Sequence, residues 1–149
     1  MEADFENMDL FCRINAQSEM PHGEFVSFIA DCVGGRRHLN TVTSDKLDIS
    51  VDDNDVFDAE KSRTGKDRWL YFRYSLDIDP AEGVSPGDYV AAIGNLLQSL
   101  WASRVEAVAS CDFEEQLPRK GSSLNGADLA VARELPLGIR TSGGGMAEK

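Results

Sequence analysis

One short motif occurs twice in the chain, and each copy stands where a helix would begin. Residues 21–26 read Pro-His-Gly-Glu-Phe-Val, and residues 86–90 read Pro-Gly-Asp-Tyr-Val, one residue shorter. Proline is well tolerated in the first turn of a helix, because its missing N–H would have no partner there. A strand-like run precedes and follows each copy, so the chain is predicted to consist of two halves, each with a strand, a helix and a second strand.

Apolar residues within both copies recur at the spacing of an amphipathic helix. The first helix is predicted to end at residue 33, because Gly34 and Gly35 follow it and glycine readily adopts the left-handed conformation that ends helices. Ser85 stands immediately before the second copy and Asp88 three residues later, which is typical of a helix N-cap. The second helix is predicted to run to about Ser103.

Four stretches alternate apolar and polar side chains, as strands with one buried face do. They cover residues 9–16, 38–51, 68–78 and 105–113. Ser44 and Asp45 are predicted to mark a bulge or bend in the second stretch. The segment 52–67 has no apolar period and is predicted to be an exposed connection.

This order of elements predicts an α+β fold of the ferredoxin-like βαββαβ type, with a four-stranded antiparallel sheet and two helices on one face. Right-handed connections would place the first and third strands in the middle and leave one sheet face uncovered. Residues 1–117 are predicted to form this domain. Residues 118–149 are rich in Gly, Ser and Arg and are predicted to form a flexible or partly ordered C-terminal tail.

Acidic side chains are concentrated in the predicted domain. The chain holds 26 acidic and 15 basic residues, for a net charge of −11, and 23 of the acids but only 10 of the bases fall within residues 1–117. A field of this sign repels phosphate backbones and anionic lipid head groups. It therefore argues against nucleic acid and membrane as partners and favours a basic protein partner.

The cysteines and histidines form no disulfide or zinc motif. Cys12, Cys32 and Cys111 lie in apolar segments, are odd in number and include no Cys-x-x-Cys pair, so they are predicted to be small buried residues. Neither His22 nor His38 completes a zinc-like set. No metal and no cofactor are expected from these residues.

The acid-rich segment 45–60 does not match a calcium-binding loop. Counted from Asp53, the fifth position is Phe57, and no glycine stands at the sixth. The start of the chain is acidic rather than basic, and no run reaches the roughly 20 apolar residues of a membrane span. A cytoplasmic protein is therefore predicted.

Two aromatic and two arginine side chains are predicted to share the uncovered sheet face. Trp69, Tyr71 and Arg73 alternate along the third predicted strand, and Arg13 would lie beside them on the first. Aromatic and arginine residues are enriched at interface centres, so this patch predicts a surface for a partner or for a homodimer. The alternative is that the C-terminal tail folds back and covers it.

A second predicted partner-binding set is acidic and includes Asp48, Asp52, Asp53 and Asp55. Acidic groups at the rim of an interface speed the encounter with a basic protein, and central ones add specificity. Together the two sets predict a binding domain rather than a catalytic one.

Catalytic motifs are absent from the sequence: it contains no phosphate-binding loop, and Cys111 has no neighbouring histidine, although His22 or His38 could approach it in space. In size, acidity and lack of catalytic motifs the chain is similar to several unrelated immunity proteins. The most concrete hypothesis is an immunity-type inhibitor that blocks a basic, nuclease-like toxin. The alternative is a dimeric ferredoxin-like small enzyme or small-ligand-binding protein, which requires a cavity lined by convergent polar groups such as Arg13, Arg73, His22 or Cys111.

Overall fold

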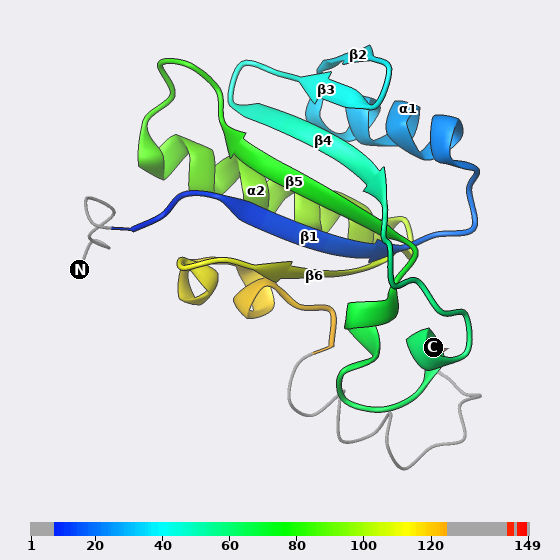
Figure 1. The fold of residues 1–149 in the computed structure, drawn as a ribbon. Coiled ribbons are helices and arrows are strands. Elements are labelled where there is room, and N and C mark those ends of the chain that lie inside the picture. The colour runs from blue at the N-terminus through cyan, green and yellow to red at the C-terminus, as the bar shows by residue number, and fades with distance from the viewer. Residues whose placement is uncertain (1–7, 125–142, 145, 149) are drawn as a thin grey trace.

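A six-stranded antiparallel sheet carries both helices on one face and leaves the other face open (Figure 1). The architecture comes from a computed structural model that describes residues 8–124, 143–144 and 146–148. Neighbouring strands follow the order β2-β3-β4-β5-β1-β6 across the sheet. The α+β class and the two helices are as predicted.

The sheet consists of β1 (Cys12–Gln17), β2 (Arg36–His38), β3 (Thr41–Thr43), β4 (Leu47–Asp53), β5 (Tyr74–Pro80) and β6 (Glu106–Ser110). The helices are α1 (His22–Val33) and α2 (Pro86–Ala102), and the short 3-10 helices are η1 (Lys61–Arg63), η2 (Arg68–Tyr71), η3 (Glu114–Gln116) and η4 (Pro118–Gly121). Near the C-terminus β7 (Gly143–Gly144) pairs in parallel with β8 (Met146–Glu148).

The predicted four-stranded ferredoxin-like sheet is wrong, because the segment predicted as one strand over 38–51 contributes to three strands. The chain reverses between β2 and β3 at Leu39, whose φ of 57° lies in the left-handed region. It turns again between β3 and β4, where the Ser44 hydroxyl accepts hydrogen bonds from the backbone N–H groups of Lys46 and Leu47. The bend predicted near Ser44 is therefore a complete turn that adds a strand to the sheet.

The third predicted strand, over 68–78, is only partly a strand. Residues Arg68–Tyr71 form η2, and β5 begins at Tyr74. From Tyr74 onward the alternating pattern is followed, and β5 pairs with β4 on one side and β1 on the other. β1 and β5 thus lie side by side inside the sheet, as predicted for the first and third strands.

Both helices begin and end close to the predicted positions. Pro21 precedes α1, and Gly34 ends it with a φ of 64°, the left-handed conformation expected of a glycine cap. Ser85 caps α2: its hydroxyl accepts a hydrogen bond of 3.2 Å from the backbone N–H of Asp88. The repeated motif therefore does open two helices.

The core lies between the helices and the sheet. Phe25 of α1 stacks on Tyr74 of β5 with ring centroids 4.5 Å apart. Tyr89 of α2 is fully buried, and its hydroxyl lies 2.6 Å from the carbonyl oxygen of Leu10 and 3.1 Å from that of Ile78. The equivalent aromatic positions of the repeated motif thus anchor each helix to the sheet.

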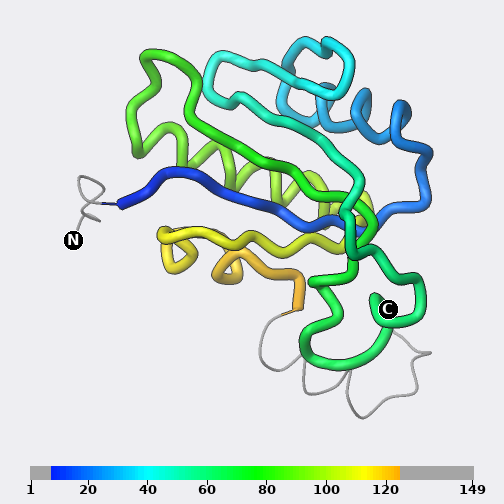
Figure 2. The backbone as a smooth tube through the Cα atoms, viewed as in Figure 1, coloured from blue at the N-terminus to red at the C-terminus, as the bar shows by residue number. Residues whose placement is uncertain are grey.

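The connection between β4 and β5 forms a lobe beside one end of the sheet (Figure 2). Asn54 holds it together, because its side-chain amide donates to the carbonyl oxygens of Leu70, at 2.9 Å, and Phe72, at 2.7 Å. Phe72 is fully buried, although much of the lobe is exposed. The segment 52–67, predicted to be an exposed connection, therefore contains η1 and folds beside η2.

Candidate functional site

The open side of the sheet presents acidic side chains from its two longest strands. Successive strand residues point to opposite faces, and alternate residues of β4 and β5 are buried against the helices. The remaining alternate positions hold acids and serines on the open side. The acids among them, which we call the acidic face, are Asp48, Asp52, Asp77 and Asp79.

Two carboxylates of the acidic face are directly opposed. Asp48 of β4 is the register partner of Asp79 of β5, and both side chains are exposed. Directly opposite residues of an antiparallel pair have Cβ atoms about 4.5–5.5 Å apart, and like charges at such positions are destabilising. Within residues 8–124 neither carboxylate has a salt bridge. No salt bridge to the described residues therefore offsets the repulsion between these two carboxylates.

Asp77, in contrast, is neutralised by Arg13 of β1. The guanidinium donates through Nε at 2.7 Å and through its second terminal nitrogen at 3.1 Å, in a two-point contact with the carboxylate. This hydrogen bonding with Asp77 raises the pKa of Arg13 above its ordinary value. The Arg13 side chain is 52% exposed, so the ion pair adds little to stability. It fixes an arginine at the border of the acidic face.

Asp52 is held in place by neutral donors. Asn40 donates to its Oδ1 at 2.8 Å, and the Ser50 hydroxyl donates to its Oδ2 at 3.1 Å. Neither donor carries a charge, so these hydrogen bonds orient the carboxylate without pairing it with a cation. A carboxylate arranged in this way is prepared for a cationic partner with little further loss of side-chain entropy.

The other two acids predicted as partner-binding lie elsewhere. Asp53 is the last residue of β4. It lies two residues after Val51, so it is on the same face of the strand as Val51, which is buried on the helix side. Asp55 follows in the lobe, and both residues are exposed. The structure thus places Asp48 and Asp52 on the acidic face and separates Asp53 and Asp55 from it.

The predicted patch of Trp69, Tyr71, Arg73 and Arg13 is not assembled. Trp69 and Tyr71 belong to η2, and Trp69 packs against a small cluster formed by Phe72, Val108 and Leu124. The Tyr71 ring lies under the Lys61 ammonium group at 5.2 Å. These rings left the sheet because the chain turns into a 3-10 helix before β5 begins. The expectation of an uncovered aromatic sheet face is therefore wrong.

The lobe and the chain after η4 cover part of the open sheet side near β6. The side-chain amide of Asn15 in β1 donates to the carbonyl oxygen of Trp69 at 3.1 Å, which places η2 against this strand. Ser122 forms an isolated antiparallel bridge with Val108 of β6. The remainder of the predicted tail, apart from β7 and β8, lies outside the described residues. Those contacts leave the acidic face on β4 and β5 uncovered by the described chain.

A cleft of about 440 Å³, which we call the arginine cleft, lies between the lobe and the ends of β1, β5 and β6. Three arginines line it: Arg63, Arg68 and Arg73. Arg68 is engaged, because it makes a two-point contact with Glu106 and donates to the carbonyl oxygen of Ser62 at 2.9 Å. The Arg73 guanidinium makes a long hydrogen bond of 3.4 Å to the carbonyl oxygen of Ser18 and lies over the Tyr74 ring at 5.0 Å.

Two of these guanidinium groups therefore keep donors for a ligand. Arg63 is exposed and, like Arg73, has no salt bridge within residues 8–124. Glu19 and Glu106 also line the cleft, so its walls carry one net positive charge. A positive cleft in a chain of net charge −11 is a local exception to the overall field. Sequence reasoning found Arg73 but missed Arg63 and Arg68, because only the folded lobe brings them together.

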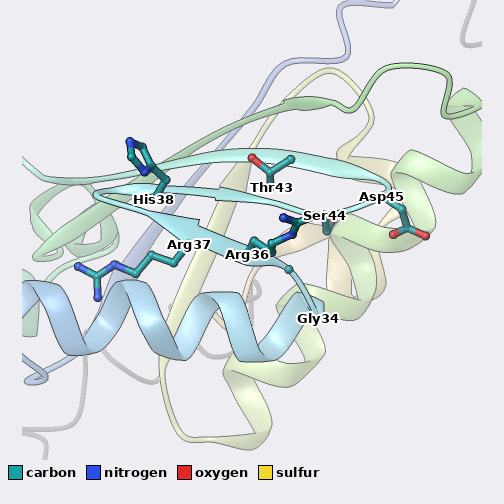
Figure 3. Close-up of a pocket in the computed structure, with 8 residues that line it drawn as sticks. Gly34, Arg36, Arg37, His38, Thr43, Ser44 and Asp45 are labelled. Atoms are coloured by element: carbon teal, nitrogen blue, oxygen red, sulfur yellow. The ribbon is translucent and has the colours of Figure 1, made fainter.

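A second cleft, of about 740 Å³, lies where α1 ends beside the β2–β3 hairpin (Figure 3). Figure 3 shows Arg37 extending alongside α1, away from Gly34. Its guanidinium donates to the carbonyl oxygens of Leu39 and Gly23 and to the Ser27 hydroxyl, at 2.8–3.0 Å. Arg37 is thus used to brace the hairpin against α1, and the cleft gathers no convergent set of reactive groups.

The residues considered for catalysis do not converge. His38 lies on β2 and Cys111 follows β6, and these strands form opposite edges of the sheet, five strand spacings or roughly 24 Å apart. His22 Nε2 lies 2.8 Å from the carbonyl oxygen of Val51, in a structural hydrogen bond. Across the described part of the chain, no three His, Cys, Asp or Glu side chains are grouped as metal ligands.

The chain matches no protein-family model, no curated protein and no solved structure. Within the described residues, no helix has the length and apolar character needed to cross a membrane. Ideas about function therefore rest on the site geometry alone.

Proposed function

We propose that the protein is a non-catalytic binding domain that docks a basic protein onto the acidic face. The directly opposed, uncompensated carboxylates of Asp48 and Asp79 carry this proposal. A lysine or arginine of a partner placed between them would replace repulsion by attraction. The fixed carboxylate of Asp52 offers a further contact on the same face.

A basic partner also fits the charge of the whole chain. A net charge of −11 accelerates the approach of a positively charged protein and slows that of an acidic one. A two-fold homodimer through this face would set the acidic face of one copy against that of the other. This repulsion favours a different, basic partner over the homodimer.

In its most concrete form, the proposal is an immunity-type inhibitor of a basic, nuclease-like toxin. A nuclease needs cationic groups to hold a polyanion, and an ordered surface of carboxylates presents a comparable array of negative charges. Such an inhibitor needs no catalytic group of its own. The proposal includes a cytoplasmic location, where a nuclease would meet its substrate.

Site-specific photocrosslinking tests the docking face. A benzoylphenylalanine introduced at Ser50, between the acids of β4, should capture a basic protein from the native host. The same group at Gln98, exposed on the outer side of α2, is the matched control. The captured protein is then purified and its association rate measured with wild type and with a variant carrying both Asp48→Lys and Asp79→Lys.

We expect the double charge reversal to slow association and added salt to weaken the wild-type complex. Glu82→Lys is the control for a change of overall charge, because Glu82 is exposed in the turn before α2. Equal capture at Ser50 and Gln98, or equal slowing by the Glu82 variant, would contradict docking at the acidic face. If the captured protein keeps its full nuclease activity in the complex, the inhibitor function is contradicted. That result would leave docking at the acidic face intact.

The arginine cleft supports a second candidate function, the binding of a small organic anion. Arg63 and Arg73 offer free donors on two sides of the cleft, and exposed Phe57 offers an apolar wall. Titration with inorganic phosphate and with citrate, followed by NMR shifts of the arginine side chains, tests it. The shifts should be lost in a double variant carrying Arg63→Gln and Arg73→Gln and kept in Arg36→Gln, and this result would favour anion binding. If the wild-type spectra did not change on titration, the cleft would bind neither of these two anions.

A further inference from the structure

Cys12 and Cys111 face each other across neighbouring strands. In the pairing of β1 with β6, Arg13 is opposite Ser110 and Ile14 is opposite Ala109. Continuing this register by one residue places Cys12 opposite Cys111. The strands stay together beyond that point, since the backbone N–H of Asp9 donates to the Asp112 carboxylate at 3.2 Å. The two side chains therefore emerge on the same side of the sheet.

The separation at such a position suits a disulfide. Directly opposite residues of antiparallel strands have Cα atoms about 4.5 or 5.5 Å apart, depending on the type of pair. Disulfides usually join Cα atoms about 4.4–6.8 Å apart. Both side chains also belong to the same apolar core, Cys12 within it and Cys111 packed against it. Both cysteines are free in the structure.

The two thiols differ in access and in ionisation. Cys12 is fully buried, whereas Cys111 is only partly buried at the end of β6. Interaction with the Cys12 thiol lowers the pKa of Cys111, and the backbone N–H of Phe113 acts in the same direction, against the opposing effects of burial and of the Glu114 and Asp112 charges. The thiolate is the reactive form of cysteine. Cys111 is thus the more accessible thiol of the two, and Cys12 lies opposite it on the neighbouring strand.

We propose that Cys12 and Cys111 form a peroxide-reactive pair, in which Cys111 is oxidised first and Cys12 closes a disulfide between β1 and β6. The Cys111 thiolate attacks one oxygen of hydrogen peroxide, the O–O bond breaks, and the leaving hydroxide takes up a proton to become water. The Cys12 sulfur, giving up its proton, then attacks the resulting sulfenic acid, and a second water leaves as the S–S bond forms. Two thiols are oxidised to one disulfide, and one peroxide is reduced to two waters.

Hydrogen peroxide suits this position better than an anionic oxidant does. Asp112 and Glu114 flank Cys111, and the Glu114 carboxylate accepts from the backbone N–H of Cys111 at 3.2 Å. These acids would repel an anionic disulfide such as oxidised glutathione, which is also too large for a partly buried thiol. Hydrogen peroxide is small and neutral, so neither the acidic neighbours nor the partial burial of Cys111 slows its approach.

Cys32 supplies a matched control within the same chain. It is partly buried, as Cys111 is, but it lies on α1 and burial raises its pKa. Treating the wild-type protein with hydrogen peroxide and mapping its peptides without reduction should show a Cys12–Cys111 disulfide, with the chain lighter by two hydrogen atoms. Cys32 should remain a thiol, and dithiothreitol should restore the original mass.

A variant separates the two steps. In Cys12→Ala the sulfenic acid on Cys111 has no resolving thiol, so dimedone should label Cys111 in that variant and label it far less in wild type. The wild-type map alone decides the proposal if the variant fails to fold. Oxidation of Cys32 before Cys111, dimers linked between chains, or sulfinic acid on Cys111 without any Cys12–Cys111 bond would each overturn it. None of these results bears on partner docking at the acidic face.

Discussion

Buried tyrosine hydroxyls show how single polar atoms order this core. The hydroxyl of Tyr74 donates to the carbonyl oxygen of Met20 at 2.6 Å, and that of Tyr89 lies 2.6 Å from the carbonyl oxygen of Leu10. Both carbonyls belong to segments that flank β1, before it and after it. The hydroxyls therefore fix the two ends of β1 relative to β5 and α2, which an apolar ring could not do.

Replacing Tyr89 by phenylalanine should destabilise the protein by about 1–3 kcal/mol, because a buried carbonyl loses its hydrogen bond while the ring still fills its space. The midpoint of urea unfolding measures the loss. Tyr71→Phe is the matched control: its ring is partly exposed in η2, and we expect a change within about 0.5 kcal/mol. Equal losses in the two variants would mean that the hydroxyl of Tyr89 has no special role.

Tyr89 also makes stability depend on pH in the alkaline range. Burial raises its pKa above the ordinary value of 10.0. Above pH 10 the unfolded chain loses this proton while the folded chain keeps it, so the unfolded state binds fewer protons and the free energy of unfolding falls as pH rises. Below pH 10 the group contributes no slope. Wild type should thus lose stability more steeply than Tyr89→Phe between pH 10 and 11, and parallel curves would contradict this assignment.

At the scale of elements, the joint between α1 and the β2–β3 hairpin depends on a glycine. A Cβ placed on Gly35 would lie 2.7 Å from the carbonyl oxygen of Thr43, and that oxygen belongs to the backbone and cannot rotate away. Gly87, in the first turn of α2, has no atom within 4 Å of the equivalent position. Close approach of β3 to the end of α1 therefore requires glycine at residue 35.

Gly35→Ala should lower the free energy of unfolding by about 1–3 kcal/mol, as overpacking commonly does. Gly87→Ala should leave it unchanged or raise it by up to about 1 kcal/mol, because alanine favours a helix more than glycine does. Urea unfolding of both variants tests the comparison. If Gly35→Ala were as stable as wild type, the contact between Gly35 and Thr43 would not be tight in solution.

Helices were more predictable from the sequence than the sheet was. Pro21 with Gly34, and Ser85 with Pro86, act locally on the backbone, so their positions predict helix ends without knowledge of the rest of the fold. The turn at Leu39 escaped prediction because leucine seldom adopts a positive φ. The position of Trp69 in a 3-10 helix was not predicted, because alternation over four residues does not distinguish a strand from a 3-10 helix.

The acidic face was only half predictable for a related reason. Asp48 and Asp52 lie in a stretch that alternates clearly, and they were assigned to partner binding from the sequence. Asp79 follows the end of the strand predicted over 68–78, and its position opposite Asp48 depends on the register between β4 and β5. Pairing between strands is a non-local property, so the uncompensated pair becomes visible only in the folded sheet.

At the scale of the whole molecule, charges of opposite sign occupy different parts of the surface. The open side is acidic on β4 and β5, whereas Arg36 lies on the β2 edge and the arginine cleft lies near the other end. A partner with a basic centre would therefore meet attraction in the middle of the face and repulsion of its cations at the sides. Such a pattern specifies orientation as well as affinity.

Repulsion between Asp48 and Asp79 should lower the free energy of unfolding of the protein. Asp79→Asn removes one member of the opposed pair, and we expect it to raise the free energy of unfolding by about 0.2–1 kcal/mol at low salt. The gain should shrink in 1 M salt, where the Debye length is about 3 Å and repulsion between exposed carboxylates is screened. Urea unfolding at both salt concentrations measures it, with Glu82→Gln as the control for a simple loss of one negative charge.

The same Asp79 variant should bind the basic partner more weakly, so that stability and binding change in opposite directions. A gain that persists in 1 M salt, or one that Glu82→Gln reproduces in full, would show that the repulsion is not local to Asp48 and Asp79.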